Sequence, residues 1–115
     1  MKSLARVRKR HGRCYELTAR AMISEPESDS WMLVHGGLGG GWFHHAWIEL
    51  DDGRIYDPSF NDYTPADQYA TKRRAVADHR YSRTEVCALL GTTPNYYGPW
   101  TDGERRAAAA RRAAV

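Results

Sequence analysis

Apolar side chains recur along this chain with two different spacings, and each spacing predicts one kind of secondary structure. Between Cys14 and Met22 they return after three or four residues, which is typical of a helix that packs one face on a core. Gly12 stands just ahead of this segment, so Cys14 falls in the first turn of the expected helix. Residues 24–30, with Pro26 among acidic and hydroxyl side chains, break the pattern and predict a loop.

Short apolar and alternating runs follow this loop and predict strands. Residues 31–35 suit a buried strand, and residues 45–50 and 54–57 predict a β-hairpin around the turn 51–53. Glycine fills five of the six positions in 36–41, which predicts either a loop where the backbone approaches a ligand or a flexible connection between strands. No Lys-Ser/Thr pair or helix start follows these glycines, so they do not form a phosphate-binding loop.

The length of the hairpin loop decides which side chains share a face of the sheet. A two-residue turn at Asp52-Gly53 would place Asp57 and His45 on opposite faces, because side chains alternate along a strand. A three-residue loop with Gly53 in the left-handed conformation instead places Asp57 across from Trp47 and diagonal to His45. We adopt the three-residue loop, which brings the imidazole and the carboxylate within reach of each other.

The rest of the chain predicts two helices, an aromatic segment and a tail. A Thr-Pro start indicates a charged surface helix over 64–79, and a capping box indicates a second helix over 82–91 with Cys87 in its buried stripe. Residues 93–100 are rich in aromatic and turn-forming residues, and we expect them to pack back onto the sheet. From residue 103 onward Ala and Arg alternate without an apolar face, which predicts a frayed tail.

The length of 115 residues suits one domain. We therefore expect a basic leader over 1–11, a single α+β domain over 12–102 and the tail over 103–115. A hydrophobic content of 42% is enough to fold this domain.

Charge and cysteine content limit the partners and the compartment. The net charge is +3, and the basic residues gather in 2–13, 72–74 and 105–112. Such clusters can bind nucleic acid, but solvated faces and tails are the interpretation we favour. No run approaches the roughly 20 apolar residues of a bilayer span, and no apolar run follows the basic start, so we expect a cytoplasmic protein that does not enter membranes. Cys14 and Cys87 are then expected to be free thiols.

Three of these positions together have the chemistry of a thiol nucleophile. A helix N-terminus and a neighbouring imidazolium both stabilise a thiolate, and Cys14 has the first of these by position. His45 on a neighbouring strand supplies the imidazole, which can deliver a proton to a leaving group. Asp57 on the next strand fixes the tautomer and orientation of that imidazole.

Other assignments of the same residues remain open. His44 competes with His45 for the role of base, although strand alternation turns it away from the Trp47 face. A zinc site could be built from Cys14, His44, His45 and His35, but the close paired spacings of a structural zinc site are missing. We expect no metal and no cofactor.

The same three positions carry a resemblance to a known family. The stretch Gly-Arg-Cys-Tyr-Glu-Leu at 12–17 resembles the nucleophile helix of papain-like and transglutaminase-like cysteine proteases. His-Ala-Trp-Ile-Glu at 45–49 resembles their histidine strand, and Tyr-Asp-Pro at 56–58 resembles their aspartate strand. The resemblance implies a nucleophile helix packed on a small antiparallel sheet, with additional C-terminal helices.

The resemblance also implies a function and roles. Cys14 would be the nucleophile, His45 the general acid and base, and Asp57 the orienting residue. Members of the family act on amide bonds of peptides or protein side chains, by hydrolysis, deamidation or acyl transfer through a thioester. The alternative function is an inactive binding protein of the same fold that holds nucleic acid or an acidic protein with its basic ends.

One departure from the family concerns the oxyanion. Papain has a glutamine ahead of its cysteine for this purpose, whereas the glutamine of this chain is Gln68, far downstream. The backbone N–H of the cysteine is the first replacement, with Arg13 and His11 as further oxyanion candidates. Trp47 and Gly41 complete the set of expected substrate-binding or oxyanion residues. The sequence does not predict the oligomeric state.

Overall fold

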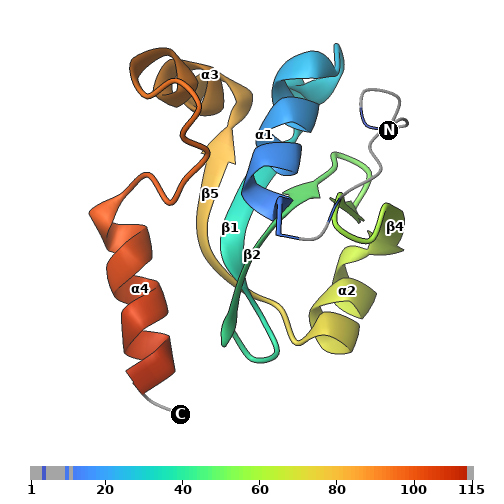
Figure 1. Ribbon diagram of the computed structural model, residues 1–115. Coiled ribbons are helices and arrows are strands. Elements are labelled where there is room, and N and C mark those ends of the chain that lie inside the picture. The colour runs from blue at the N-terminus through green and yellow to red at the C-terminus, as the bar shows by residue number, and fades with distance from the viewer. Residues whose placement is uncertain (1–3, 5–9, 11, 114–115) are drawn as a thin grey trace.

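The computed structural model describes Leu4, Arg10 and residues 12–113. This part of the chain forms an α+β domain in which four α-helices surround a five-stranded antiparallel sheet of order β4-β3-β2-β1-β5 (Figure 1). The elements are α1 (Cys14–Ser24), the short 3-10 turn η2 (Ser28–Ser30), β1 (Met32–Leu38), β2 (Phe43–Glu49), β3 (Arg54–Asp57), β4 (Asp62–Pro65), α2 (Ala66–Arg73), β5 (Val76–Ser82), α3 (Arg83–Thr92) and α4 (Asp102–Ala113). The α+β class and the helix on an antiparallel sheet are as the sequence predicts.

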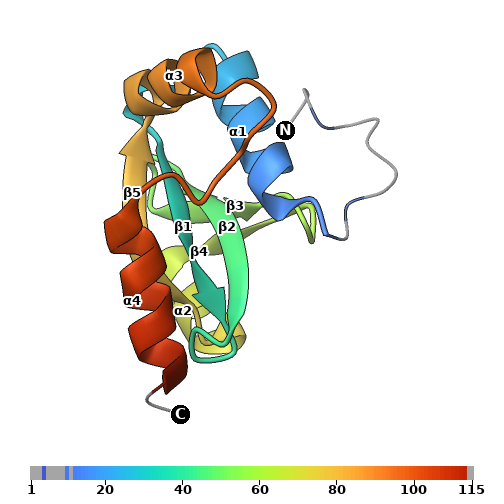
Figure 2. The same cartoon turned by 60° about the vertical axis from the view of Figure 1, so that its left-hand side comes forward.

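The two faces of the sheet are covered by different helices. On one face α1 and α3 pack side by side at one end, and α4 lies beside the other end (Figure 2). The core beneath them contains Leu17, Met22, Leu33, Ile48, Tyr56, Tyr81 and Val86. On the other face Tyr69 of α2 packs on Val34, Trp47 and Ile55. Strand alternation therefore assigns successive residues of β2 to two separate cores.

The hairpin has the three-residue loop that the sequence predicts. Ile48 pairs with Tyr56 in the β2–β3 ladder, and Leu50 N–H donates to Arg54 carbonyl at 2.9 Å to close the loop. Gly53 has a φ of +85°, the left-handed conformation that such a loop requires. This register continues to place Asp57 across from Trp47, so the prediction about the shared face is confirmed.

The glycine-rich segment is shorter than expected. Gly36 and Gly37 belong to β1, where they pair with both β2 and β5. A Cβ on Gly36 would lie 2.0 Å from the carbonyl oxygen of Val76, and one on Gly37 would lie 2.6 Å from that of Gly41. These glycines allow backbone segments to approach each other closely, and the loop that remains is 39–42.

The helix predicted over 64–79 was wrong in its extent. Helix α2 ends at Arg73 because Arg74 adopts the left-handed conformation, with a φ of +51°. The chain then forms β5, which pairs with β1 along the sheet edge. Thr64 and Pro65 end β4 instead of starting the helix. The charged residues of this region gave a helical pattern, but tertiary pairing with β1 overrode it.

The capping box and the aromatic segment are confirmed, whereas the burial of Cys87 is not. Ser82 and Glu85 form both bonds of the capping box at the start of α3. This helix continues through Gly91 to Thr92, and Cys87 lies on its exposed side. Trp100, from the segment 93–100, packs against the core.

The C-terminal residues form helix α4 where a frayed tail was expected. The helix buries only Glu104 and Ala108, so its attachment is mainly polar. Arg111 forms an ion pair with Asp78 of β5 and also bonds the carbonyl of Gly41. Of the predicted basic leader 1–11, only Leu4 and Arg10 lie within the described residues, and Leu4 is buried in the core. None of the helices in the described part of the chain combines the length and hydrophobicity of a membrane span.

Candidate functional site

The structure brings Cys14, His45 and Asp57 together. Cys14 is the first residue of α1, and it lines the same hollow as His45 of β2. The thiol is one of the groups that raise the pKa of His45. His45 Nε2 lies 2.8 Å from Oδ2 of Asp57 on β3. Because Nε2 is engaged by the carboxylate, Nδ1 is the ring nitrogen left to exchange a proton with the thiol.

Asp57 is fully buried and held by two further donors. The hydroxyl of Tyr69, on α2, donates to Oδ2 at 2.6 Å, and the backbone N–H of Ser59 donates to Oδ1 at 2.9 Å. Burial beside this carboxylate raises the pKa of Tyr69 far above its ordinary value, so the phenol stays protonated and remains a donor. Both carboxylate oxygens are thereby fixed in position, and with them the imidazole of His45.

The electrostatics of His45 favour the charged ring. Burial, which leaves 8% of the residue exposed, opposes protonation. The hydrogen bonds to Asp57 and Cys14 outweigh this effect and raise the pKa of His45 to about 9. An imidazolium between a carboxylate and a sulfur atom is therefore the form of this ring near neutral pH.

Two hollows meet at Cys14. The first, which we call the aromatic hollow, has a volume of about 360 Å³, and the second, the polar hollow, has a volume of about 270 Å³. The aromatic hollow is lined by Gly12, Cys14, Leu38, Phe43, His44, His45, Ser59 and Phe60. The polar hollow is lined by Gly12, Arg13, Cys14, Tyr15, Glu16, Tyr97 and Gly98. A molecule bound across both hollows would pass directly over the thiol.

The start of α1 offers unsatisfied backbone donors at the same place. No side chain caps this helix. Its first backbone hydrogen bond runs from the N–H of Leu17 to the carbonyl of Arg13. The N–H groups of Cys14, Tyr15 and Glu16 therefore have no partner within the helix. Their partial positive charge faces the end of the helix that carries the thiol.

The other predicted site residues have different positions. Arg13 lines the polar hollow and is bonded to Glu16 at 2.9 Å. Trp47 stacks beside His45 at 6.4 Å and is only 3% exposed, so it packs in the core next to the imidazole. Gly41 lies under α4, where its carbonyl accepts from Arg111, and is not among the residues that line either hollow. His11 lies outside the described residues.

The structure does not arrange the residues of the alternative zinc site as metal ligands. Across Leu4, Arg10 and residues 12–113, no group of three or more His, Cys, Asp or Glu side chains could hold a metal ion. His35 is fully buried and bonded to Glu104 on α4. His44 lines the aromatic hollow, and within the described residues it forms no hydrogen bond with the thiol.

Three residues of the site were missed by sequence analysis: Tyr69, Phe43 and Phe60. Tyr69 is the one buried residue of the polar helix α2, and an isolated aromatic residue in such a helix is a signal that could have identified it. Phe43 and Phe60 are 63% and 44% exposed beside the thiol. Large exposed aromatic side chains have no signature in sequence, because their burial depends on the surrounding fold.

These local features are the available guide to function. No protein-family model, curated protein or solved structure matches the chain.

Proposed function

We propose that this protein is a cysteine-nucleophile hydrolase or acyl transferase that acts on an amide bond through a thioester. The observation that carries the proposal is that His45, bonded to the buried carboxylate of Asp57, lines the same hollow as the Cys14 thiol at the start of helix α1. The resemblance to papain-like and transglutaminase-like proteins, in the residues around Cys14, His45 and Asp57, supports the same assignment.

The chemistry follows from the positions of the protons. The proposed reaction begins from a pair in which His45 holds the proton and Cys14 is the thiolate. The sulfur attacks the carbonyl carbon of the amide, and a C–S bond forms while the carbonyl electrons move onto oxygen. Collapse of this intermediate breaks the C–N bond, and the His45 proton passes to the departing amine. Water or a second amine then attacks the thioester, gives its proton to His45 and releases the thiolate.

The oxyanion of this intermediate is assigned to the start of α1. The backbone N–H of Cys14 lies next to the sulfur and has no acceptor among the described residues, and its neighbours in the first turn add to the positive potential. No glutamine is required for this role. The two hollows beside the thiol leave room for the acyl part and the amine part of the substrate.

The first test is the pH dependence of iodoacetamide alkylation, located by mass spectrometry. Cys14 should react rapidly near about pH 6, whereas exposed Cys87 in the same molecule should react as an ordinary thiol. His45→Ala should bring the rate of Cys14 down to that of Cys87. His79→Ala is the matched control, because His79 lies on β5 and lines neither hollow.

A screen of peptide and side-chain amides with a free amine as second acceptor then distinguishes hydrolysis from transfer. An acyl-enzyme at Cys14, detected as a mass increase that hydroxylamine removes, is the expected intermediate. Equal alkylation rates at Cys14 and Cys87 at every pH would defeat the proposal. In that case the same fold without activity, as a binding protein, becomes the better description.

A further inference from the structure

A cavity of about 470 Å³ lies between α4 and the sheet, outside the two hollows at Cys14. Pro99, Ala108 and Ala109 give it an apolar wall. Three side chains with nitrogen donors also line it: His44, Arg105 and Arg112. Its volume is large enough for several heavy atoms of a ligand and for the apolar contacts that such a ligand needs.

Both oxygens of each of the two carboxylates in the cavity wall already accept hydrogen bonds. Arg111 donates to both oxygens of Asp78, with one of these bonds at 2.9 Å. Glu104 accepts from His35 Nδ1 at 2.7 Å through one oxygen and from the Tyr81 hydroxyl at 2.6 Å through the other. Because each carboxylate oxygen has a strong donor, the cavity offers little to a cationic ligand.

The two arginines of the cavity wall differ in their partners. Arg105 pairs with Asp102 at 3.0 Å. Arg112 donates through Nε and Nη2 to the carbonyl of Trp42, at 3.2 and 3.0 Å, and forms no ion pair with any carboxylate of residues 12–113. The guanidinium of Arg112 also lies 5.7 Å from the centre of the Trp42 ring. A carbonyl oxygen and an aromatic ring are both neutral, so Arg112 has no carboxylate partner among the described residues, and none of its hydrogen bonds to them uses Nη1.

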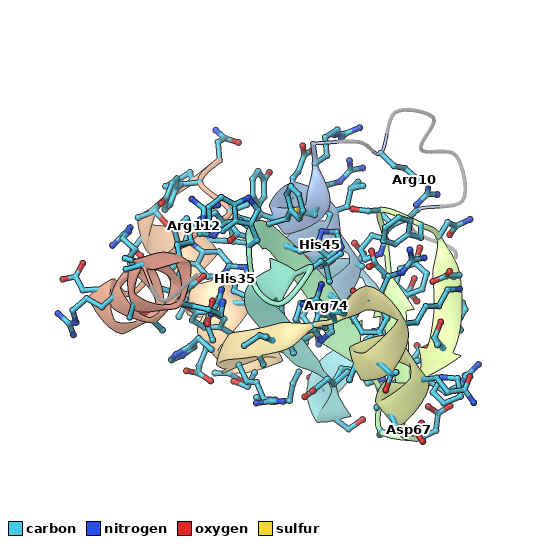
Figure 3. All side chains as sticks on the ribbon, turned by 90° about the horizontal axis from the view of Figure 1, so that it is seen from below. Arg10, His35, His45, Asp67, Arg74 and Arg112 are labelled. Atoms are coloured by element: carbon cyan, nitrogen blue, oxygen red, sulfur yellow. The ribbon has the colours of Figure 1, made fainter. Side chains whose placement is uncertain are left out.

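His44 connects this cavity with the thiol site. The residue lines both the cavity and the aromatic hollow, and it precedes His45 on β2. Burial, together with the nearby Arg112 and Arg111, lowers the pKa of His44, although Asp78 and Glu104 act in the opposite direction. The ring is therefore neutral near pH 7 and can donate one hydrogen bond without adding charge. Figure 3 shows Arg112 on the α4 side of His45.

From this arrangement we infer that the cavity is a carboxylate-binding subsite of the Cys14 site. The inference rests on the proposed function and specifies its substrate class: an amide whose chain passes His44 and ends in a carboxylate that Arg112 binds. Ala108, Ala109 and Pro99 contact the apolar part of that chain. The carboxylate is either the C-terminus of a peptide or the side chain of an acidic residue.

Charged and neutral affinity labels of increasing length test this subsite. N-iodoacetyl derivatives of glycine, β-alanine and longer ω-amino acids are compared with the corresponding primary amides, and alkylation of Cys14 and Cys87 is measured in each molecule. At one spacer length the carboxylate should accelerate alkylation of Cys14 by about three- to tenfold over the amide, the gain of one charge-assisted contact. Exposed Cys87 should show no such preference.

Three variants assign the effect to the cavity. Arg112→Gln should reduce the carboxylate preference at Cys14 to that of Cys87. Arg106→Gln removes the same charge from an exposed position of α4 outside the cavity and should leave the preference intact. Ala109→Glu adds a negative charge to the cavity wall and should reverse the preference without removing any existing contact.

The outcomes separate this inference from the proposed function. If Cys14 reacts rapidly with iodoacetamide but shows no carboxylate preference at any length, the subsite is wrong and the thiol site stands. A preference that survives Arg112→Gln also overturns the subsite. If Cys14 is as slow as Cys87 with iodoacetamide, the thiol site itself fails.

Protection experiments then distinguish the two sources of the carboxylate. Peptides with a free C-terminus, with an amidated C-terminus, and with an amidated C-terminus plus an internal glutamate are tested for slowing the alkylation of Cys14. Protection by the first alone identifies a C-terminal carboxylate. Protection by the third identifies an acidic side chain, and protection by the amidated peptide without glutamate contradicts a role for any carboxylate.

Discussion

His35 Nδ1 lies 2.7 Å from Oε1 of Glu104, and this buried pair joins strand β1 to helix α4. Tyr15, the residue after the thiol, stacks on the same imidazole with ring centres 4.3 Å apart. The hydroxyl of Tyr81 occupies the other oxygen of Glu104. The C-terminal helix is thereby connected, through one histidine, to the first turn of the helix that carries Cys14.

Glu104→Gln should destabilise the protein by about 1–3 kcal/mol, because both of its partners are donors and the amide nitrogen cannot accept from either. Burial alone would raise the pKa of Glu104, but the hydrogen bonds from His35 and Tyr81 lower it below its ordinary value of 4.5. The contribution is therefore complete above pH 4.5 and is lost as the pH falls through the lowered value. Urea unfolding at neutral and acidic pH measures this loss, with exposed Glu27→Gln as control. Equal stability of the wild type and Glu104→Gln at neutral pH would contradict a stabilising role for the Glu104 carboxylate.

The stability that His45 contributes should decrease at alkaline pH. Its pKa is raised from 6.5 to about 9, so the folded state favours the imidazolium. The stabilisation that results is fully present below pH 6.5 and is lost as the pH rises through about 9. The stability difference between wild type and His45→Gln should narrow by up to about 3 kcal/mol across this range. Chemical unfolding of both proteins at several pH values measures it. A difference that is independent of pH would mean that folding does not raise the pKa of His45.

Tyr69→Phe tests whether the hydroxyl on Asp57 positions the imidazole. The variant keeps the ring that packs at 5.4 Å from Trp47 and removes only the donor at 2.6 Å from the carboxylate. We expect a loss of about 1–2 kcal/mol in stability. A severalfold slower alkylation of Cys14 near pH 6 should accompany it, because Asp57 can then rotate away from His45. Tyr63→Phe, in an exposed ring, is the control.

The ion pairs of α4 should differ in strength because they differ in burial. Asp78 and Arg111 expose only 4% and 16% of their side chains, whereas Arg105 and Asp102 are largely solvated. Arg111→Gln leaves a buried carboxylate without its counter-ion and should cost about 3 kcal/mol. Arg105→Gln should change the unfolding free energy little, because solvent screens its pair. Similar losses in the two variants would show that α4 is not held by the buried pair.

Glycine substitutions test the close approach between β1 and β5. Gly36→Ala should destabilise the protein by more than about 2 kcal/mol, because the new Cβ would meet the Val76 carbonyl oxygen. Gly91→Ala introduces a methyl group into open space in α3 and should stabilise the protein by about 0.5–1 kcal/mol. Thermal unfolding of both variants gives the comparison. If Gly36→Ala is tolerated as well as Gly91→Ala, the strands are not packed as closely as described.

The sequence by itself determined the local elements around the candidate site. The apolar spacing after Gly12 placed Cys14 in the first turn of a helix, and the Ser82–Glu85 capping box placed the start of another. Gly53 required a left-handed turn, and that requirement fixed the strand register that aligns Asp57 with His45. These features depend on neighbouring residues, whose physical chemistry is the same before and after folding.

Only the tertiary structure decided the features that depend on distant segments. Residues 76–82 became a strand because β1 offered an unpaired edge, although their composition resembles a surface helix. Helix α4 formed because Glu104 and Arg111 found buried partners far away in the sequence. The hydroxyl of Tyr69 and the cavity beside Arg112 have the same origin. Burial and charge balance are properties of segments brought together in space. A local pattern can mark a residue such as Tyr69 as buried, but it does not specify which distant group that residue will contact.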